Sequence, residues 1–294
     1  MKNRKTDSLT KLLITLLALA VCVLATRCSD DDDNGGSGPP PTNPEKVKLG
    51  TSTTLGEYLT DADGNALYIF SNDVAGQNTC TGGCATNWPI YNAGTLSADN
   101  LGEGLSIDDF GSVTTPAGAQ TTYKGWPLYY YAPGGTREAS GQTTGEAVGG
   151  IWFVAKTDYT FMIANAQLIG MDGKHYKGDY TEGDQMVKYF VDDKGRTIYA
   201  FMNDKKDENN FTNGDGAHDA TWPIYGAGMA SVPSTLDPDL FGNITVMGNT
   251  QLTYKGWPLY YFKNDANRGD NKGVSVPAPG VWPVVVADIG EAPE

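Results

Sequence analysis

Cysteine and histidine are scarce in this 294-residue chain, which has four Cys and two His. A zinc site needs about four such ligands close together, and histidine-dependent catalysis needs a nucleophile and an acid beside the ring. The sequence has neither grouping, and it also lacks a nucleophile motif and a Cys-x-x-Cys-His haem motif. We therefore expect no bound metal, no cofactor and no enzymatic activity.

Basic residues are also few, with 21 Lys and Arg against 35 Asp and Glu and a net charge of −14. A chain this acidic repels nucleic acid and anionic lipid headgroups, so neither is an expected partner. A cationic ligand is permitted, although an acidic surface more often serves solubility.

Long apolar runs are absent apart from residues 12–25, which follow a basic stretch containing Lys2, Arg4, Lys5 and Lys11. The run is shorter than the roughly 20 residues that a membrane-spanning helix needs. A basic start followed by a short apolar core is typical of an export signal. We therefore interpret residues 1–27 as a signal peptide.

Cys28 stands directly after this run and resembles the lipidated cysteine of a bacterial lipoprotein signal. Arg27 departs from the small residue usual before that cysteine, and the alternative is an unmodified cysteine beside an ordinary signal peptide. The acidic run 30–33 resembles a surface-export signal of some Gram-negative lipoproteins, or it is a solvated spacer. Residues 28–45 then form an acidic, Gly/Pro-rich linker. We expect a lipid anchor in the outer membrane and a body that faces the cell exterior.

Sustained helical periodicity is also missing, whereas short strand-like runs flank Asp/Gly turns at residues 61–65 and 192–195. This order is typical of β-hairpins. Many short strands with regular turns predict an all-β fold, either an antiparallel β-sandwich or a small barrel. The sequence does not decide between the two.

Internal repetition is the most specific pattern that is present. Residues 122–130 read TYKGWPLYY and recur unchanged at 253–261, an offset of 131. The six tryptophans fall into three pairs at similar offsets: Trp88 and Trp222, Trp126 and Trp257, Trp152 and Trp282. This predicts two tandem domains related by duplication, at 46–156 and 157–294, each with its own core. An insertion at 169–183 is expected to form a polar hairpin or loop.

A weaker repeat lies within each copy. The pattern Tyr-x-[Phe]-x-x-Asp starts at Tyr68, Tyr199 and Tyr260, and near Tyr129 it keeps the aromatics but has Gly134 in place of the acid. Each copy therefore holds two aromatic strands of similar design. The three motif carboxylates either satisfy backbone groups in turns or act as ligands for a cation. They are Asp73, Asp204 and Asp265.

Aromatic side chains gather around the same strands. The set consists of Trp126, Tyr129, Tyr131, Trp257, Tyr260 and Phe262. These rings form a stacking platform for a ligand, or they belong to the core, since alternate residues of a strand face opposite sides.

Cys80 and Cys84 are the only cysteines left once residues 1–27 are removed and Cys28 is acylated. In an oxidising compartment two cysteines this close favour a disulfide. The alternative is a redox pair. The second copy has no cysteine, so we expect the fold not to depend on the bridge.

These motifs resemble the secreted repeats of unknown function in bacterial lipoproteins, which are known by a Y-x-[FWY]-x-x-D motif. The resemblance covers both copies and implies secretion and tandem repetition, but no activity. We expect a non-enzymatic binding module for an unknown ligand or protein partner. One alternative is a redox or electron-transfer accessory lipoprotein that uses Cys80 and Cys84. Another is a structural or adhesive surface component.

Overall fold

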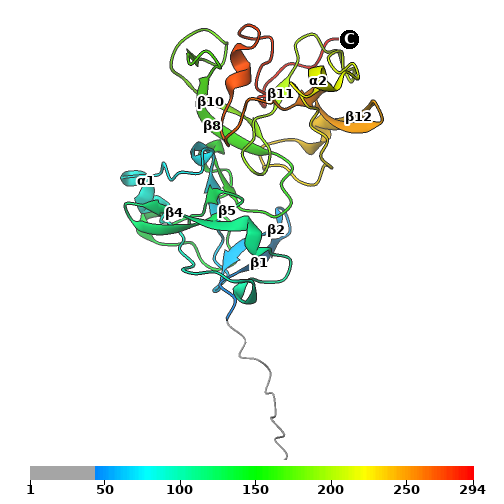
Figure 1. Ribbon diagram of the computed structural model, residues 1–294. Helices are drawn as coiled ribbons and strands as arrows, with labels where there is room; N and C mark the ends of the chain where they lie inside the picture. The colour runs from blue at the N-terminus through cyan, green and yellow to red at the C-terminus, as the bar shows by residue number, and fades with distance from the viewer. Residues whose placement is uncertain (1–43) are drawn as a thin grey trace, which may run out of the picture. The chain divides into compact units, whose positions relative to one another are not determined.

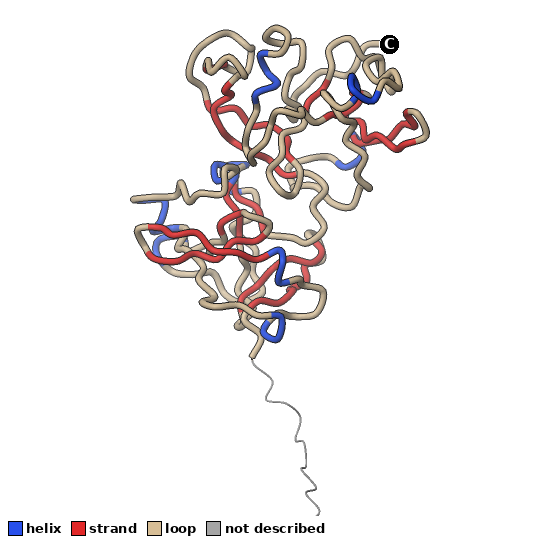
Figure 2. The backbone as a smooth tube through the Cα atoms, viewed as in Figure 1, coloured by secondary structure: helices blue, strands red, loops and turns tan. Residues whose placement is uncertain are grey.

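Short strands joined by long loops make up residues 44–294, the part of the chain that the computed structural model describes (Figures 1 and 2). The named strands pair antiparallel in five sheets of two to four strands. None of these sheets closes into a barrel. The predicted all-β, antiparallel class is confirmed, whereas the signal peptide, Cys28 and nearly all of the linker lie outside the described residues.

The first copy contains seven strands in three sheets. Their bounds are β1 (Val47–Ser52), β2 (Gly56–Asp61), β3 (Tyr68–Phe70), β4 (Phe110–Thr115), β5 (Gly118–Tyr123), β6 (Trp126–Pro127) and β7 (Trp152–Val154). The sheets are β1-β2, β3-β7 and β4-β5-β6. Two hairpins with identical pairing lengths, β1-β2 and β4-β5, therefore open the two halves of this copy.

The second copy repeats this plan with a longer first hairpin. Its strands are β8 (Met162–Ile169), β9 (His175–Tyr176), β10 (Met186–Val191), β11 (Tyr199–Ala200), β12 (Phe241–Val246), β13 (Asn249–Tyr254) and β14 (Trp257–Tyr260). They form the sheets β10-β8-β9 and β11-β14-β13-β12. The insertion 169–183 forms a hairpin whose strand β9 extends the first of these sheets.

Helices are few and short in the described residues. The α-helices are α1 (Gly83–Asn87) and α2 (Gly216–Asp219). The 3₁₀ turns are η1 (Ser71–Asp73), η2 (Ala98–Asn100), η3 (Ile107–Asp109), η4 (Pro133–Gly135), η5 (Val148–Gly150), η6 (Pro238–Leu240) and η7 (Lys272–Ser275). No helix among residues 44–294 has the length and apolar character needed to cross a membrane.

The two aromatic strands of each copy lie side by side. Tyr68 and Tyr129 exchange two backbone hydrogen bonds, each 2.9 Å long, and Tyr199 pairs with Tyr260 in the same antiparallel way. The tryptophans follow this symmetry. Trp88 stacks on Trp152 with ring centroids 3.7 Å apart, and Trp222 stacks on Trp282 at 3.8 Å. Each copy is therefore a pair of half-copies, 47–91 with 110–155 and 162–225 with 241–286.

Closed rings of three backbone hydrogen bonds join the two half-copies of each copy. In each ring, one amide donates to the carbonyl of the next residue until the circuit closes. The complete rings are Leu59–Ala155–Leu67, Tyr91–Leu128–Thr121 and Phe190–Val285–Ile198. A fourth set, in the second copy, shows two matching bonds, from Tyr225 to Leu259 and from Leu252 to Tyr225. Buried backbone groups that leave the regular strands are thereby paired.

The larger hydrophobic cluster contains buried residues of both copies, such as Leu59 and Leu128 from the first and Phe190 and Leu259 from the second. A second cluster belongs to the first copy and surrounds Trp88. Residues 42–294 form one unit. Independent folding of 46–156 and 157–294 stays a prediction.

Candidate functional site

The motif tyrosines and carboxylates meet in the middle of each copy, but they pair across the two half-copies. Tyr129 donates its hydroxyl to Asp73, the acid of the motif that Tyr68 begins, at 2.5 Å. In the second copy, Tyr260 donates to Asp204 and Tyr199 to Asp265, both at 2.7 Å. The motif is therefore satisfied only when two half-copies lie together.

Glu138 completes the set where the sequence shows no motif acid. The hydroxyl of Tyr68 donates to Oε1 of Glu138 at 2.5 Å, and the other carboxylate oxygen accepts from the amide and hydroxyl of Thr144. The position four residues after Gly134 escaped sequence reasoning because it lies outside the motif spacing. Glu138 can be recognised as the fourth acid only from the three-dimensional structure, where it accepts the hydrogen bond from Tyr68.

Glycine is required above two of these tyrosines. The amides of Gly145 and Gly273 each lie 3.2 Å from the hydroxyl oxygen of Tyr68 and Tyr199, respectively. A Cβ atom at Gly145 would come within 2.8 Å of the Tyr68 ring. Only a residue without a side chain lets the amide reach the hydroxyl.

Burial governs the protonation of the three motif aspartates, which are at most 7% exposed. Loss of hydration raises the pKa of Asp73 to about 6, that of Asp204 to about 6 and that of Asp265 to about 7. Hydrogen bonds from the tyrosine hydroxyls act in the opposite direction and stabilise the carboxylates.

Cation binding by these carboxylates is not favoured by their contacts. Each uses one oxygen for a tyrosine and the other for a backbone amide: Thr79 for Asp73, Asn210 for Asp204 and Lys272 for Asp265. Within residues 44–294 no three His, Cys, Asp or Glu side chains gather as a metal-binding group. The geometry therefore supports the structural interpretation of the motif acids.

The two copies differ in how they close the loop before the tryptophan stack. Cys80 and Cys84 form a disulfide in the first copy, as predicted. At the offsets of 131 and 134, the second copy has Phe211 and His218 in their places. These two rings stack with their centroids 4.2 Å apart.

A cavity of 390 Å³ lies beside this stack in the second copy. Its apolar walls come from Phe201, Phe211, Trp222, Pro277, Val281 and Trp282, and its polar groups from Asn203, His218 and Thr221. Phe201 lies flat against Trp282 at 4.4 Å, and Phe211 meets the same indole edge-on at 4.9 Å. No carboxylate, lysine or arginine lines the cavity.

Comparison with known families identifies the repeated unit. A family model described as a secreted repeat of unknown function matches residues 51–91 and 244–286. The chain carries this secreted repeat. Each matched segment spans most of one half-copy, from the hairpin through the motif strand to the tryptophan of the stack. No curated protein and no solved structure matches the chain.

The two matches confirm the predicted resemblance to this secreted repeat, and they indicate an extracytoplasmic protein. The aromatic residues that were considered as a stacking platform lie in or beside the motif strands, and most of them are buried. Trp126, Tyr129, Trp257, Tyr260 and Phe262 are at most 4% exposed. Tyr131 is half-buried and packs against Trp88 at 4.5 Å. In this conformation the six rings offer little surface on which a ligand can stack.

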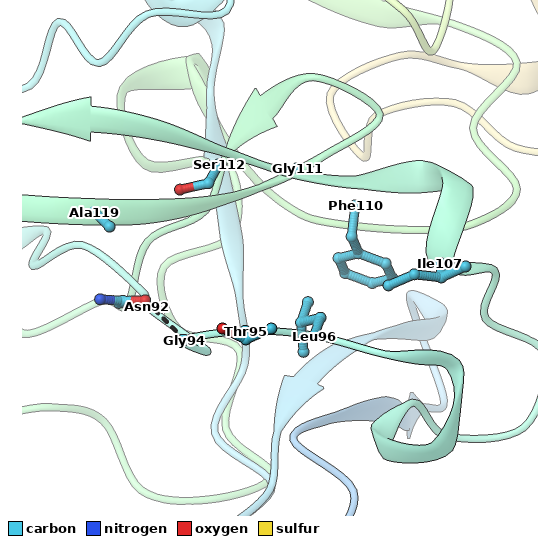
Figure 3. Close-up of a pocket in the computed structure, with 9 residues that line it drawn as sticks. All are labelled: Asn92, Gly94, Thr95, Leu96, Ile107, Phe110, Gly111, Ser112 and Ala119. Carbon is cyan, nitrogen blue, oxygen red and sulfur yellow. Dashed lines mark hydrogen bonds between the residues drawn. The ribbon is translucent and has the colours of Figure 1, made fainter.

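A second cavity, of 640 Å³, adjoins the β4-β5 hairpin of the first copy (Figure 3). Phe110 and Ile107 form its apolar end together with Leu96, and the segment from Asn92 to Leu96 faces the β4-β5 ribbon that carries Ser112 and Ala119 (Figure 3). None of its lining side chains is ionisable. It can bind a neutral group but offers no acid or base for catalysis.

Proposed function

We propose that this protein is a non-enzymatic binding protein, anchored by a lipid on Cys28 to the outer membrane with its repeats facing the cell exterior. The basic and apolar N-terminal sequence, Cys28 and the acidic run 30–33 support the anchor and its direction. The match to a secreted repeat supports an exported body.

The ligand site of this proposal is the cavity beside Phe211 in the second copy. Binding sites are typically concave and mostly apolar, with a few polar groups that orient the ligand. The cavity has four aromatic side chains, while the amide of Asn203, the hydroxyl of Thr221 and the imidazole of His218 supply the polar groups. This arrangement is the observation that carries the proposal.

The lining also defines the class of ligand. Aromatic walls favour a flat apolar face, and the absence of charged lining groups disfavours an ion, which would lose hydration without a partner. Asn203, Thr221 and His218 can exchange hydrogen bonds with the polar edge of a ring. The ligand is therefore an uncharged ring compound with one apolar face, such as a sugar or a phenol.

A titration tests this site directly. Uncharged saccharides and uncharged phenolic or indole compounds are added to the purified protein, and binding is followed by tryptophan fluorescence and calorimetry. Phe211→Ala removes one wall, and the loss of an aromatic contact of about 0.5–1.5 kcal/mol corresponds to a Kd that is about two- to twelvefold weaker. Binding that survives Phe211→Ala unchanged, or a panel with no binder, contradicts the proposal.

Met202→Ala is the matched control. Met202 follows Phe201 in the chain, is 44% exposed and does not line the cavity. Its replacement should leave Kd unchanged. Comparing the saccharides with the phenolic and indole compounds shows which of these two classes of ring compound the cavity binds.

A further inference from the structure

The first copy receives the second on a face made by Lys124, Gly125 and Trp126. The indole nitrogen of Trp126 donates to the carbonyl of Asp193 at 2.9 Å, and the ammonium of Lys124 lies 2.7 Å from the Asp193 carboxylate. Arg268 donates to the Lys124 carbonyl at 2.9 Å and lies over the Trp126 ring at 4.8 Å. A Cβ at Gly125 would come within 1.8 Å of the Arg268 guanidinium, so the face is closely fitted.

The second copy has the same face, made by Lys255, Gly256 and Trp257, but residues 288–294 of the chain cover it. The indole nitrogen of Trp257 donates to the carbonyl of Gly290 at 2.8 Å. The Lys255 carbonyl accepts from the amide of Ala292 at 3.0 Å, and the Lys255 ammonium donates to the Ile289 carbonyl at 2.9 Å.

The two faces thus use the same atoms. In both, the indole nitrogen donates to a backbone carbonyl, the lysine carbonyl accepts one hydrogen bond, and the lysine ammonium binds oxygen atoms. The first face is filled by a turn and an arginine of the next copy, and the second by residues 288–294. The covering segment is also tied down by its Glu294, which lies 3.1 Å from the ammonium of Lys206.

We propose that residues 288–294 are an intramolecular cover on a docking face, and that the partner which binds when they leave is a second molecule of this chain. The second molecule would present the turn 61–65 of its first copy, which corresponds to the turn 192–196 that fills the first face. Ala62 and Asp63 are exposed at that turn.

Two substitutions make docking between molecules weaker than docking within the chain. Gly141 donates to the carbonyl of Gly64 at 3.0 Å, as Gly269 does to that of Gly195 at 2.8 Å. The residue before Gly269 is Arg268, whereas the residue before Gly141 is Ser140. Similarly, Ala62 stands at the position of Asp193. The cover therefore competes against a partner that lacks two of the polar groups used at the first face.

Docking of this kind joins unlike surfaces, so it does not close into a symmetric pair. Heterologous contacts build open chains unless the rotation between subunits happens to form a ring. The expected product of release is a head-to-tail series in which the second copy of one molecule carries the first copy of the next.

The test compares the full chain without its signal peptide with a version that ends at residue 287. Sedimentation should show a monomer for the former and concentration-dependent dimers and longer species for the latter. Adding Ala62→Asp and Ser140→Arg to the shortened chain restores the groups of Asp193 and Arg268, and should tighten association at least tenfold. Ala62→Lys, which places a like charge toward Lys255, should return the shortened chain to a monomer.

A folded, shortened chain that remains monomeric with both added substitutions overturns the proposal. Association that Ala62→Lys leaves unchanged also overturns it, because another surface is then responsible. Hydrogen exchange on the full chain provides a test that does not depend on truncation. The amides of Ala292 and Lys206, which bond across the cover, should exchange faster than those of β13, whereas exchange at the same rate shows that the segment is an inseparable part of the core.

Discussion

The hydroxyl of Tyr260 lies 2.7 Å from Oδ2 of Asp204, although these residues belong to two different copies of the motif. Each motif tyrosine thus meets the acid of the other motif. This crossed pairing follows from the antiparallel pairing of Tyr199 with Tyr260, which places each tyrosine ring beside the loop that follows the opposite strand. A lone half-copy would leave both its tyrosine hydroxyl and its acid without these partners. This explains why half-copies occur in pairs.

Removing one hydroxyl should therefore destabilise the protein. Tyr199→Phe leaves Asp265 without its tyrosine donor and the amide of Gly273 without its acceptor, and unmet buried groups cost about 1–3 kcal/mol each. The midpoint of thermal unfolding, measured by calorimetry, should fall by at least several degrees. Tyr131→Phe is the control, since the Tyr131 hydroxyl has no hydrogen bond to another residue of 44–294. An equal fall of the unfolding midpoint in both variants would contradict a stabilising role for the crossed tyrosine–acid pairs.

Stability should decrease with rising pH through these aspartates. Their folded pKa values of about 6 to 7 lie above the ordinary value near 4, so the unfolded chain gives up these protons first. The contribution is complete below about pH 4 and is lost as the pH rises through 6 to 7.

Asp265→Asn isolates this effect, because an amide does not titrate. The difference in Tm between the wild type and Asp265→Asn should be largest near pH 4.5 and should shrink by pH 8. Exposed carboxylates titrate alike in both proteins and cancel in the comparison. A difference that grows with pH would show that Asp265 is stabilised as the anion.

Loss of the Cys80–Cys84 bridge should cost about 2 kcal/mol or less, since it closes a very short loop. Reduction, or Cys80→Ser with Cys84→Ser, should lower Tm by a few degrees and leave ligand binding in the second copy unchanged. A change in electron transfer or in binding, with Tm unaltered, would favour the redox alternative instead.

Mass spectrometry of membrane-extracted protein should find a diacylglyceryl cysteine at residue 28. Cys28→Ala should release the protein from the membrane, and its retention there would disprove the anchor. Protease added to intact cells should remove the repeats. Complete protection would instead indicate a body that faces the periplasm.

The sequence by itself predicted the duplication, the Asp/Gly turns at residues 61–65 and 192–195 and the cysteine bridge, although the strands on either side of each turn lie in different sheets. These features depend on local chemistry: Asp and Gly favour turns, and two cysteines four residues apart come within reach of a disulfide wherever the chain between them turns. Repetition of TYKGWPLYY is visible without any knowledge of contacts.

Only the tertiary structure decided which acid each tyrosine meets, because the partners are 56 to 70 residues apart. It also gave Glu138 its role and placed the aromatic residues around Trp126 and Trp257 in the core, since burial depends on the strands that pack above a side chain. The likeness of residues 288–294 to a docked turn has no counterpart in sequence. Backbone carbonyls and the amide of Ala292 make those contacts, and such backbone groups are common to nearly every residue.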